Sequence, residues 1–201
     1  REAIAERFPD DPIVGEEYDE KKGSSPYQWV LDPIDGTKAF ITGVPLYTTL
    51  IGVQKAGEPV LGVIHAPATS ETVYAGVGGR CWYVEADAEP VPTQVSQTRR
   101  FAEATMLTSS VRSYETERRP GCHDVYRRLE DAGLLARTGG DAYGYLLVAA
   151  GRADVMVDPA LNLWDAVAVQ PIIEAAGGRF TDWQGQATVH TGEGVARNGL
   201  L

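Results

Sequence analysis

The chain has 201 residues, of which 43% are apolar, and 28 acidic against 18 basic side chains give it a formal net charge of −10. This composition can form a buried core, but the acidic balance excludes nucleic acid held by bulk charge as the main partner. No apolar run approaches the roughly 18 residues of a membrane span. The charged start Arg1-Glu2 and the presence of only two cysteines favour a cytoplasmic protein without a signal peptide.

The first half of the chain predicts an antiparallel sheet. Residues 2–7 are typical of the end of a helix, so we expect further residues upstream of Arg1. After the apolar pair Ile13-Val14 and a polar loop over 19–26, β-branched and aromatic runs alternate with glycine-containing turns. These runs predict strands at 27–31, 46–53, 59–66, 71–74 and 80–84.

The second half of the chain alternates between strands and helices. Each predicted helix is followed by a glycine, which is typical of a helix C-terminus. The pattern predicts strands at 104–108, 134–137, 153–157 and 179–181, and helices at 124–132, 142–150 and 164–176. We therefore expect a layered α/β sandwich forming a single unit over 1–201, with an antiparallel-sheet half over about 1–100 and an α/β half over 101–201.

Three acidic segments are candidates for binding magnesium, which prefers carboxylate and phosphate oxygens as ligands. The first is Gly15-Glu16-Glu17, directly after the apolar Ile13-Val14, which places at least one carboxylate at the edge of the sheet. A solvated pair of surface carboxylates would give the same sequence, so this segment alone leaves both interpretations open.

The second segment is Asp-Pro-Ile-Asp-Gly-Thr over 32–37, which follows a strand that should be buried. Pro33 fixes its own φ and restricts Asp32, and a tight turn would bring Asp32 and Asp35 to face one point. The backbone N–H groups of Gly36 and Thr37, at the start of a helical turn, could bind a phosphate. The alternative is an ordinary Asx-Pro turn.

The third segment is Asn162-Leu163-Trp164-Asp165, at the beginning of an apolar run. Asp165 would lie in the first turn of the predicted helix. Capping and the helix dipole favour aspartate at this place without any metal, so Asp165 alone does not decide between the two interpretations.

Together, the sequences GEE (15–17), WVLDPIDGTKAF (29–40) and LWDAVAVQPIIEAAGG (163–178) resemble the inositol monophosphatase family of metal-dependent phosphatases in order and spacing. The resemblance covers nearly the whole chain. It implies the family's α-β-α-β-α sandwich with its N-terminal part missing, a homodimer, and two or three Mg²⁺ ions in each active site. The family's mobile loop, which helps to position the attacking water, would lie upstream of Arg1.

Carried over by position, the resemblance implies a role for each matching residue. Glu16, Asp32, Asp35 and Asp165 would be catalytic metal-binding carboxylates, the backbone carbonyl of Ile34 would be a further ligand, and Asp32 would bridge two ions. Gly36 and Thr37 would hold the phosphate through backbone N–H groups, and Glu17 would lie next to the metal ligands without contacting the metal. Gly139, Gly140, Asp141 and Asp158 would line the substrate side.

Within that family, the sequence RTGGDAYGY over 137–145 is most similar to the bacterial histidinol-phosphatase branch. Asp141 departs from the Gly-Ser/Thr-Ala type of sequence that inositol-directed members carry at 139–141, and an added carboxylate would suit a cationic amino alcohol. The resemblance thus implies a histidinol-phosphate phosphatase of histidine biosynthesis, which acts by direct attack of a metal-activated water without a phosphoenzyme. An inositol-1-monophosphatase, a broad-specificity small-molecule phosphatase and a non-catalytic metal-binding domain are the alternatives.

Overall fold

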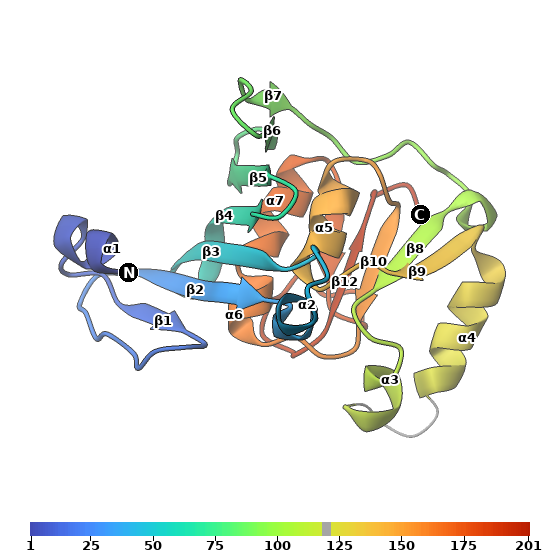
Figure 1. Cartoon of the computed structure of the whole chain (residues 1–201), viewed down its shortest axis with the longest axis horizontal. Coiled ribbons are helices and arrows are strands. Elements are labelled where there is room, and N and C mark those ends of the chain that lie inside the picture. The colour runs from blue at the N-terminus through green and yellow to red at the C-terminus, as the bar shows by residue number, and fades with distance from the viewer. Residues whose placement is uncertain (118–121) are drawn as a thin grey trace.

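The computed structural model describes residues 1–117 and 122–201 and contains two β-sheets (Figure 1). The strands are β1 (Ile13–Gly15), β2 (Tyr27–Asp35), β3 (Thr48–Lys55), β4 (Glu58–Ala66), β5 (Glu71–Gly76), β6 (Trp82–Glu85), β7 (Val91–Pro92), β8 (Thr105–Thr108), β9 (Leu135–Thr138), β10 (Val155–Asp158), β11 (Arg179–Thr181) and β12 (Gly194–Arg197). The first sheet has the strand order β1-β2-β3-β4-β5-β6-β7, and the second has the order β11-β12-β10-β8-β9.

The helices alternate with the sheets in layers. They are α1 (Glu2–Arg7), α2 (Thr37–Thr42), α3 (Ser113–Thr116), α4 (Cys122–Ala132), α5 (Ala142–Ala149), α6 (Leu163–Ala166) and α7 (Val169–Ala175), with a 3-10 turn at Phe101–Glu103. Helices α5 and α7 lie between the sheets, since each contacts β4 and β5 of the first sheet and β12 of the second. None of the helices in the described part of the chain is long and apolar enough to cross a lipid bilayer.

Strand alternation separates two apolar clusters on the faces of the second sheet. Met156 of β10 joins the core between the sheets, whereas Val155 and Val157 point to the other face. There they meet Tyr126 of α4 and Tyr114 of α3 in a second cluster. The order of layers is thus sheet, helices, sheet, helices, as the sequence predicted.

One predicted helix is wrong, and one strand of the second sheet was not predicted. The single helix expected over 164–176 is divided into α6 and α7, because Pro171 has no N–H to donate to the carbonyl of Val167. The strand predicted at 179–181 is β11 (Arg179–Thr181), and a further strand follows it in the chain. The missed strand β12 pairs antiparallel with both β10 and β11 and lies between them.

A pair of glycines sets the distance between the first sheet and the junction of α6 and α7. Gly52 of β3 and Gly62 of β4 are opposite each other in the strand register. A Cβ atom on Gly62 would lie 1.9 Å from the carbonyl oxygen of Ala168, and one on Gly52 would lie 2.6 Å from Cγ1 of Val167. Only residues without a side chain allow this approach, so the pair also sets the position of α6 and its Asp165.

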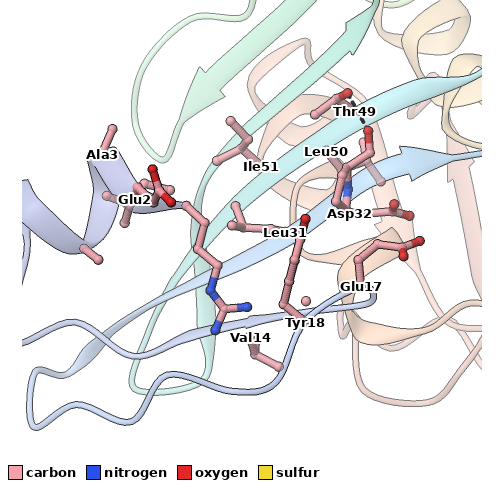
Figure 2. A pocket seen from close by; sticks show the side chains of 15 residues that line it. Glu2, Ala3, Val14, Glu17, Tyr18, Leu31, Asp32, Thr49, Leu50 and Ile51 are labelled. Atoms are coloured by element: carbon pink, nitrogen blue, oxygen red, sulfur yellow. Dashed lines mark hydrogen bonds between the residues drawn. The ribbon is translucent and has the colours of Figure 1, made fainter.

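An open groove of about 740 Å³ lies between α1 and the strands β1, β2 and β3 (Figure 2). Val14, Leu31 and Ile51 contribute apolar side chains to its lining. Figure 2 shows Glu17 and Asp32 close together, at a distance from α1 along the groove. Asp32 also belongs to the carboxylate cluster described below, so the groove opens onto that cluster.

Candidate metal centre and active site

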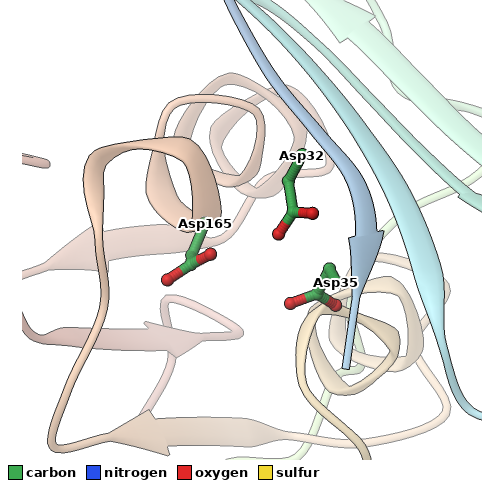
Figure 3. Close-up of side chains that lie close together, drawn as sticks. All are labelled: Asp32, Asp35 and Asp165. Atoms are coloured by element: carbon green, nitrogen blue, oxygen red, sulfur yellow. The ribbon is translucent and has the colours of Figure 1, made fainter. Parts of the chain in front are cut away.

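An irregularity in β2 brings Asp32 and Asp35 to the same side. Both residues lie within the strand, which corrects the tight turn expected after residue 31. Residues three positions apart in a regular strand point to opposite faces. The pairing of β2 with β3 shifts its register between Asp32 and Asp35, and both side chains point toward Asp165 (Figure 3).

Asp165 reaches this cluster from the first turn of α6. One ligand oxygen from each of Asp32, Asp35 and Asp165 lies within 4.8 Å of the other two. Asp165 also accepts the backbone N–H of Asn162 on Oδ2 at 2.7 Å. Asp165 therefore caps the helix and belongs to the carboxylate cluster at the same time, which is possible because a carboxylate has two acceptor oxygens.

The protein holds Asp35 firmly in place. Its Oδ2 atom accepts the hydroxyl of Thr48 at 2.6 Å and the backbone N–H of Ala142 at 2.8 Å. Thr48 comes from β3 and Ala142 begins α5, so two further elements orient the side chain. Both bonds use the same oxygen, and Oδ1 remains for a ligand.

Burial and crowding raise the pKa values of the clustered carboxylates. Burial, followed by the negative charges of Glu16 and Asp165, raises the pKa of Asp32 to about 7. Burial is also the main cause that raises the pKa of Asp165 to about 6, and burial together with nearby Asp141 raises the pKa of Asp35 well above its ordinary value. A divalent cation would relieve this repulsion, and a set of carboxylate oxygens fits a hard ion such as Mg²⁺.

Glu16 and Glu17 follow β1 and are both exposed. Strand β1 pairs parallel with β2, with Gly15 opposite Leu31, so Glu16 lies beside Asp32 in the sheet. Glu16 is outside the group of three ligand atoms within 4.8 Å of one another, although its charge raises the pKa values of Asp32 and Asp165. Glu17 lines the groove next to Asp32.

The segment after β2 has the geometry of a tight strand-to-helix connection. Gly36 has φ +75°, a conformation that glycine adopts without strain, and it directly precedes α2. The hydroxyl of Thr37 donates to the carbonyl of Ile34 at 3.1 Å. The N–H groups of the first turn of a helix have no partner within the helix, so those of Thr37 and the next residues are available to an anion.

Two of the four residues expected on the substrate side, Asp141 and Asp158, share a cavity with Asp35 and Asp165 of the cluster, and Gly139 and Gly140 are not in its lining. This small cavity of about 40 Å³ is lined by Asp35, Ser109, Asp141, Ala142, Tyr145, Asp158, Ala160, Leu161 and Asp165. Asp141 comes close to Gly36, since a Cβ atom on this glycine would lie 2.9 Å from Oδ2 of Asp141. Burial raises the pKa of Asp141, and Lys38 acts in the opposite direction. Gly139 and Gly140 make room for Leu107 and Leu46.

Asp158 is the most enclosed of these residues, with an exposed fraction of 1%. It accepts the N–H of Ser109 at 2.9 Å, the hydroxyl of Ser109 at 2.6 Å and the hydroxyl of Tyr145 at 2.9 Å. Burial raises its pKa to about 6. These three bonds occupy both of its oxygens, so Asp158 joins β8, β10 and α5 at the wall of the cavity.

Sequence reasoning missed several residues that shape this site. Thr48 and Ala142 orient Asp35, and Ser109 and Tyr145 hold Asp158. Ser109 carried a usable signal, because it follows directly on a predicted strand of the second sheet. Thr48 and Ala142 carried none, since their contacts join parts of the chain that only the folded structure brings together.

The whole length of the chain is similar to known proteins. The model of the inositol monophosphatase family matches residues 1–200. A histidinol-phosphatase of Chlorobaculum parvum is 40% identical over 195 residues, which are 97% of this chain and 72% of that protein. A histidinol-phosphatase of Mycobacterium tuberculosis is 35% identical over 201 residues, 100% of this chain and 76% of its own. The solved structure of an inositol monophosphatase from Anabaena matches with a TM-score of 0.89 at 27% identity, covering 99% of this chain and 78% of that one.

Proposed function

The chain belongs to the inositol monophosphatase family of phosphoric monoester hydrolases, and we propose that it is a magnesium-dependent phosphatase acting on histidinol phosphate. The observation that carries the proposal is the convergence of Asp32, Asp35 and Asp165 from two elements far apart in the sequence. Histidinol phosphate is the substrate class favoured by the similarity to two histidinol-phosphatases and by Asp141 beside the cluster. Such an enzyme would work in histidine biosynthesis, in the cytoplasm.

In this proposal Asp32, Asp35 and Asp165 bind the metal, and Glu16 and the backbone carbonyl of Ile34 are further ligands. Glu17 lies next to the ligands without binding the metal itself. Bound Mg²⁺, as two or three ions, would polarise the phosphoryl oxygens and lower the pKa of the attacking water. The hydrogen bonds from Thr48 and Ala142 hold Asp35 in one orientation before the metal binds. The N–H groups of Gly36 and Thr37 would bind the phosphate.

The place of Asp141 suits an ammonium group close to the phosphate. In histidinol phosphate the amino group is on the carbon next to the CH₂–O–P unit, so a carboxylate that binds it has to lie near the phosphate. Oδ2 of Asp141 lies beside Gly36, at the proposed phosphate position. Gly139, Gly140 and Asp158 would shape this side of the site. The inositol ring carries no cation, so Asp141 gives no advantage to inositol 1-phosphate.

Phosphate release from histidinol phosphate and from inositol 1-phosphate, with Mg²⁺ and with a chelator, tests the proposal. We expect faster release from histidinol phosphate and none with the chelator. Equal rates on both esters would favour a broad-specificity phosphatase, and a preference for the inositol ester would favour an inositol monophosphatase. If the protein binds metal but hydrolyses no small phosphate ester, it would instead be a non-catalytic metal-binding domain.

We also propose that the protein is a homodimer. Phe40, Ile41 and Val44, on α2 and just after it, expose large apolar side chains within five positions of one another, and exposed apolar surface of this kind favours an interface. Sedimentation of the wild-type protein and of Ile41→Glu would test this. We expect a dimer for the former and a weakened dimer for the latter, and a monomeric wild type would contradict it.

A further inference from the structure

The first turn of α5 connects carboxylates from three different strands. The backbone N–H of Ala142 donates to Asp35 of β2 at 2.8 Å. The hydroxyl of Tyr143 donates to Oε2 of Glu71 in β5 at 2.7 Å, and the hydroxyl of Tyr145 donates to Asp158 of β10 at 2.9 Å. The position of this one turn therefore decides whether Asp35 of the metal cluster receives the second of its two hydrogen bonds, the one from Ala142 that adds to the bond from Thr48.

Glu71, the first residue of β5, is not one of the clustered metal-binding carboxylates and has no part in the proposed reaction. Its exposed fraction is 4%, and it accepts bonds from Tyr143 and from Tyr83 of β6 at 2.7 Å each. Arg152 donates to it at 2.6 Å and lies over the ring of Tyr83. Burial acts to raise the pKa of Glu71, but the hydrogen bonds from Tyr143, Tyr83 and Thr69 and the charge of Arg152 together leave this pKa below its ordinary value.

The partners of Glu71 hold both ends of α5. Tyr143 lies in the first turn of the helix, and Arg152 follows just after its last residue, Ala149. After Tyr145, which is bonded to Asp158, the helix continues with apolar and mostly buried residues, whose side chains make no polar contacts. Glu71 thus ties the first turn of α5 and the segment after its last turn to the first sheet, while the bond from Tyr145 to Asp158 ties the helix to the second sheet.

We propose that Glu71 is a positioning residue for the metal centre, which acts through Tyr143 and Arg152 to hold α5 where the N–H of Ala142 meets Asp35. The inference rests on the proposed function, since it assumes that Asp35 binds metal. Groups hydrogen-bonded directly to metal ligands typically change metal affinity by about 10- to 100-fold when they are removed, and the N–H of Ala142 is such a group for Asp35. The loss of the Tyr143 hydroxyl should therefore weaken metal binding without touching any ligand.

Two matched variants test the inference. Tyr143→Phe and Tyr83→Phe each remove one hydroxyl of equal donor distance from the same carboxylate, but only Tyr143 belongs to α5. Mn²⁺ binding would be measured directly by calorimetry and by electron paramagnetic resonance, with the Mg²⁺ dependence of turnover as a second readout. We expect about 10-fold weaker Mn²⁺ binding for Tyr143→Phe, less than about 2-fold change for Tyr83→Phe, and similar melting temperatures for the two variants.

The possible failures can be told apart. Unchanged Mn²⁺ binding in Tyr143→Phe, or an equal loss in both variants, would overturn the positioning role and leave Glu71 as a support of the fold alone. A wild-type protein that binds no Mn²⁺ would overturn the proposed metal centre itself, and the inference with it.

Discussion

At the scale of single residues, Asp35 combines a ligand role with tight structural support. Replacing it by asparagine keeps an acceptor oxygen for Thr48 and Ala142 but removes the negative charge that a metal needs. We expect Asp35→Asn to stay folded and to lose Mg²⁺-dependent phosphate release by about 100-fold or more, since metal stabilisation contributes several kcal/mol. Rates close to those of the wild type, in a variant with an unchanged circular dichroism spectrum, would contradict the assignment.

Asp141 should decide between substrates rather than support catalysis in general. We expect Asp141→Asn to lower kcat/KM for histidinol phosphate by about 10- to 100-fold, the value of a hydrogen bond to a charged group. The same change should affect inositol 1-phosphate much less, because that ester has no ammonium group to pair with Asp141. Side-by-side kinetics on the two esters give the answer, and equal losses on both would remove Asp141 as a selectivity residue.

The sequence could identify the charged residues of the site but not the groups that hold them. Asp32, Asp35 and Asp165 lie in motifs that are readable in one dimension, and the structure brings these three together. Glu71 looked like an ordinary residue at the start of a strand. Its importance comes from Tyr143 and Arg152, which are more than 70 positions away in the chain, and no local pattern records such a contact.

At the scale of elements, the close approach of the α6–α7 junction to β3 and β4 depends on Gly62. Its Cβ atom would meet the backbone oxygen of Ala168 at 1.9 Å, and backbone cannot move aside as a flexible side chain can. We expect Gly62→Ala to destabilise the protein by about 3 kcal/mol, or about 6–12 °C in melting temperature.

Gly76→Ala is the matched control for this prediction. A Cβ atom at Gly76 would have an ordinary contact of 3.6 Å with the carbonyl oxygen of Val60, so we expect a change below about 1 kcal/mol. Because α6 carries Asp165, Gly62→Ala should also weaken Mn²⁺ binding, and Gly76→Ala should not. Equal melting temperatures for the two variants would show that the sheet and helix can separate at little cost.

Local patterns predicted the long elements well and the irregular ones badly. The strand expected over 59–66 is β4 (Glu58–Ala66), because its apolar run and the preceding turn are both local signals. The shift in β2 between Asp32 and Asp35 depends on its pairing with β3, which the sequence of β2 alone does not contain. Strand β12 is only Gly194–Arg197, and so short a run has no clear periodicity.

At the scale of the whole molecule, the raised pKa values make the stability of the metal-free protein depend on pH. The pKa of Asp32 is about 7 and that of Asp165 about 6 in the folded state, both above the ordinary 3.8. Between the ordinary pKa of 3.8 and the raised pKa of each group, the folded state binds more protons than the unfolded state. The stability contributed by these groups therefore falls as pH rises from about 4 to about 7.

Melting temperatures in chelator from pH 5 to pH 8 measure this effect, with Asp32→Asn as the reference. We expect the wild type to lose stability relative to the variant as pH rises, by at least about 3 °C, which corresponds to about 1 kcal/mol for a chain of this size. Excess Mg²⁺ at pH 8 should restore the stability of the wild type, since a ligand at about 100 times its Kd adds about 2.7 kcal/mol to the free energy of unfolding. A difference that does not change with pH would contradict the raised pKa values.

The strand order of the second sheet also has a consequence for biosynthesis. Strand β12 comes after β11 in the chain but lies between β11 and β10. Until β12 emerges from the ribosome, β11 has no neighbour to join and β10 presents a bare edge, which is the kind of surface that promotes aggregation. Completion of this sheet therefore has to wait until residues 194–197 have left the exit tunnel, and the edge of β10 stays open to other chains until then.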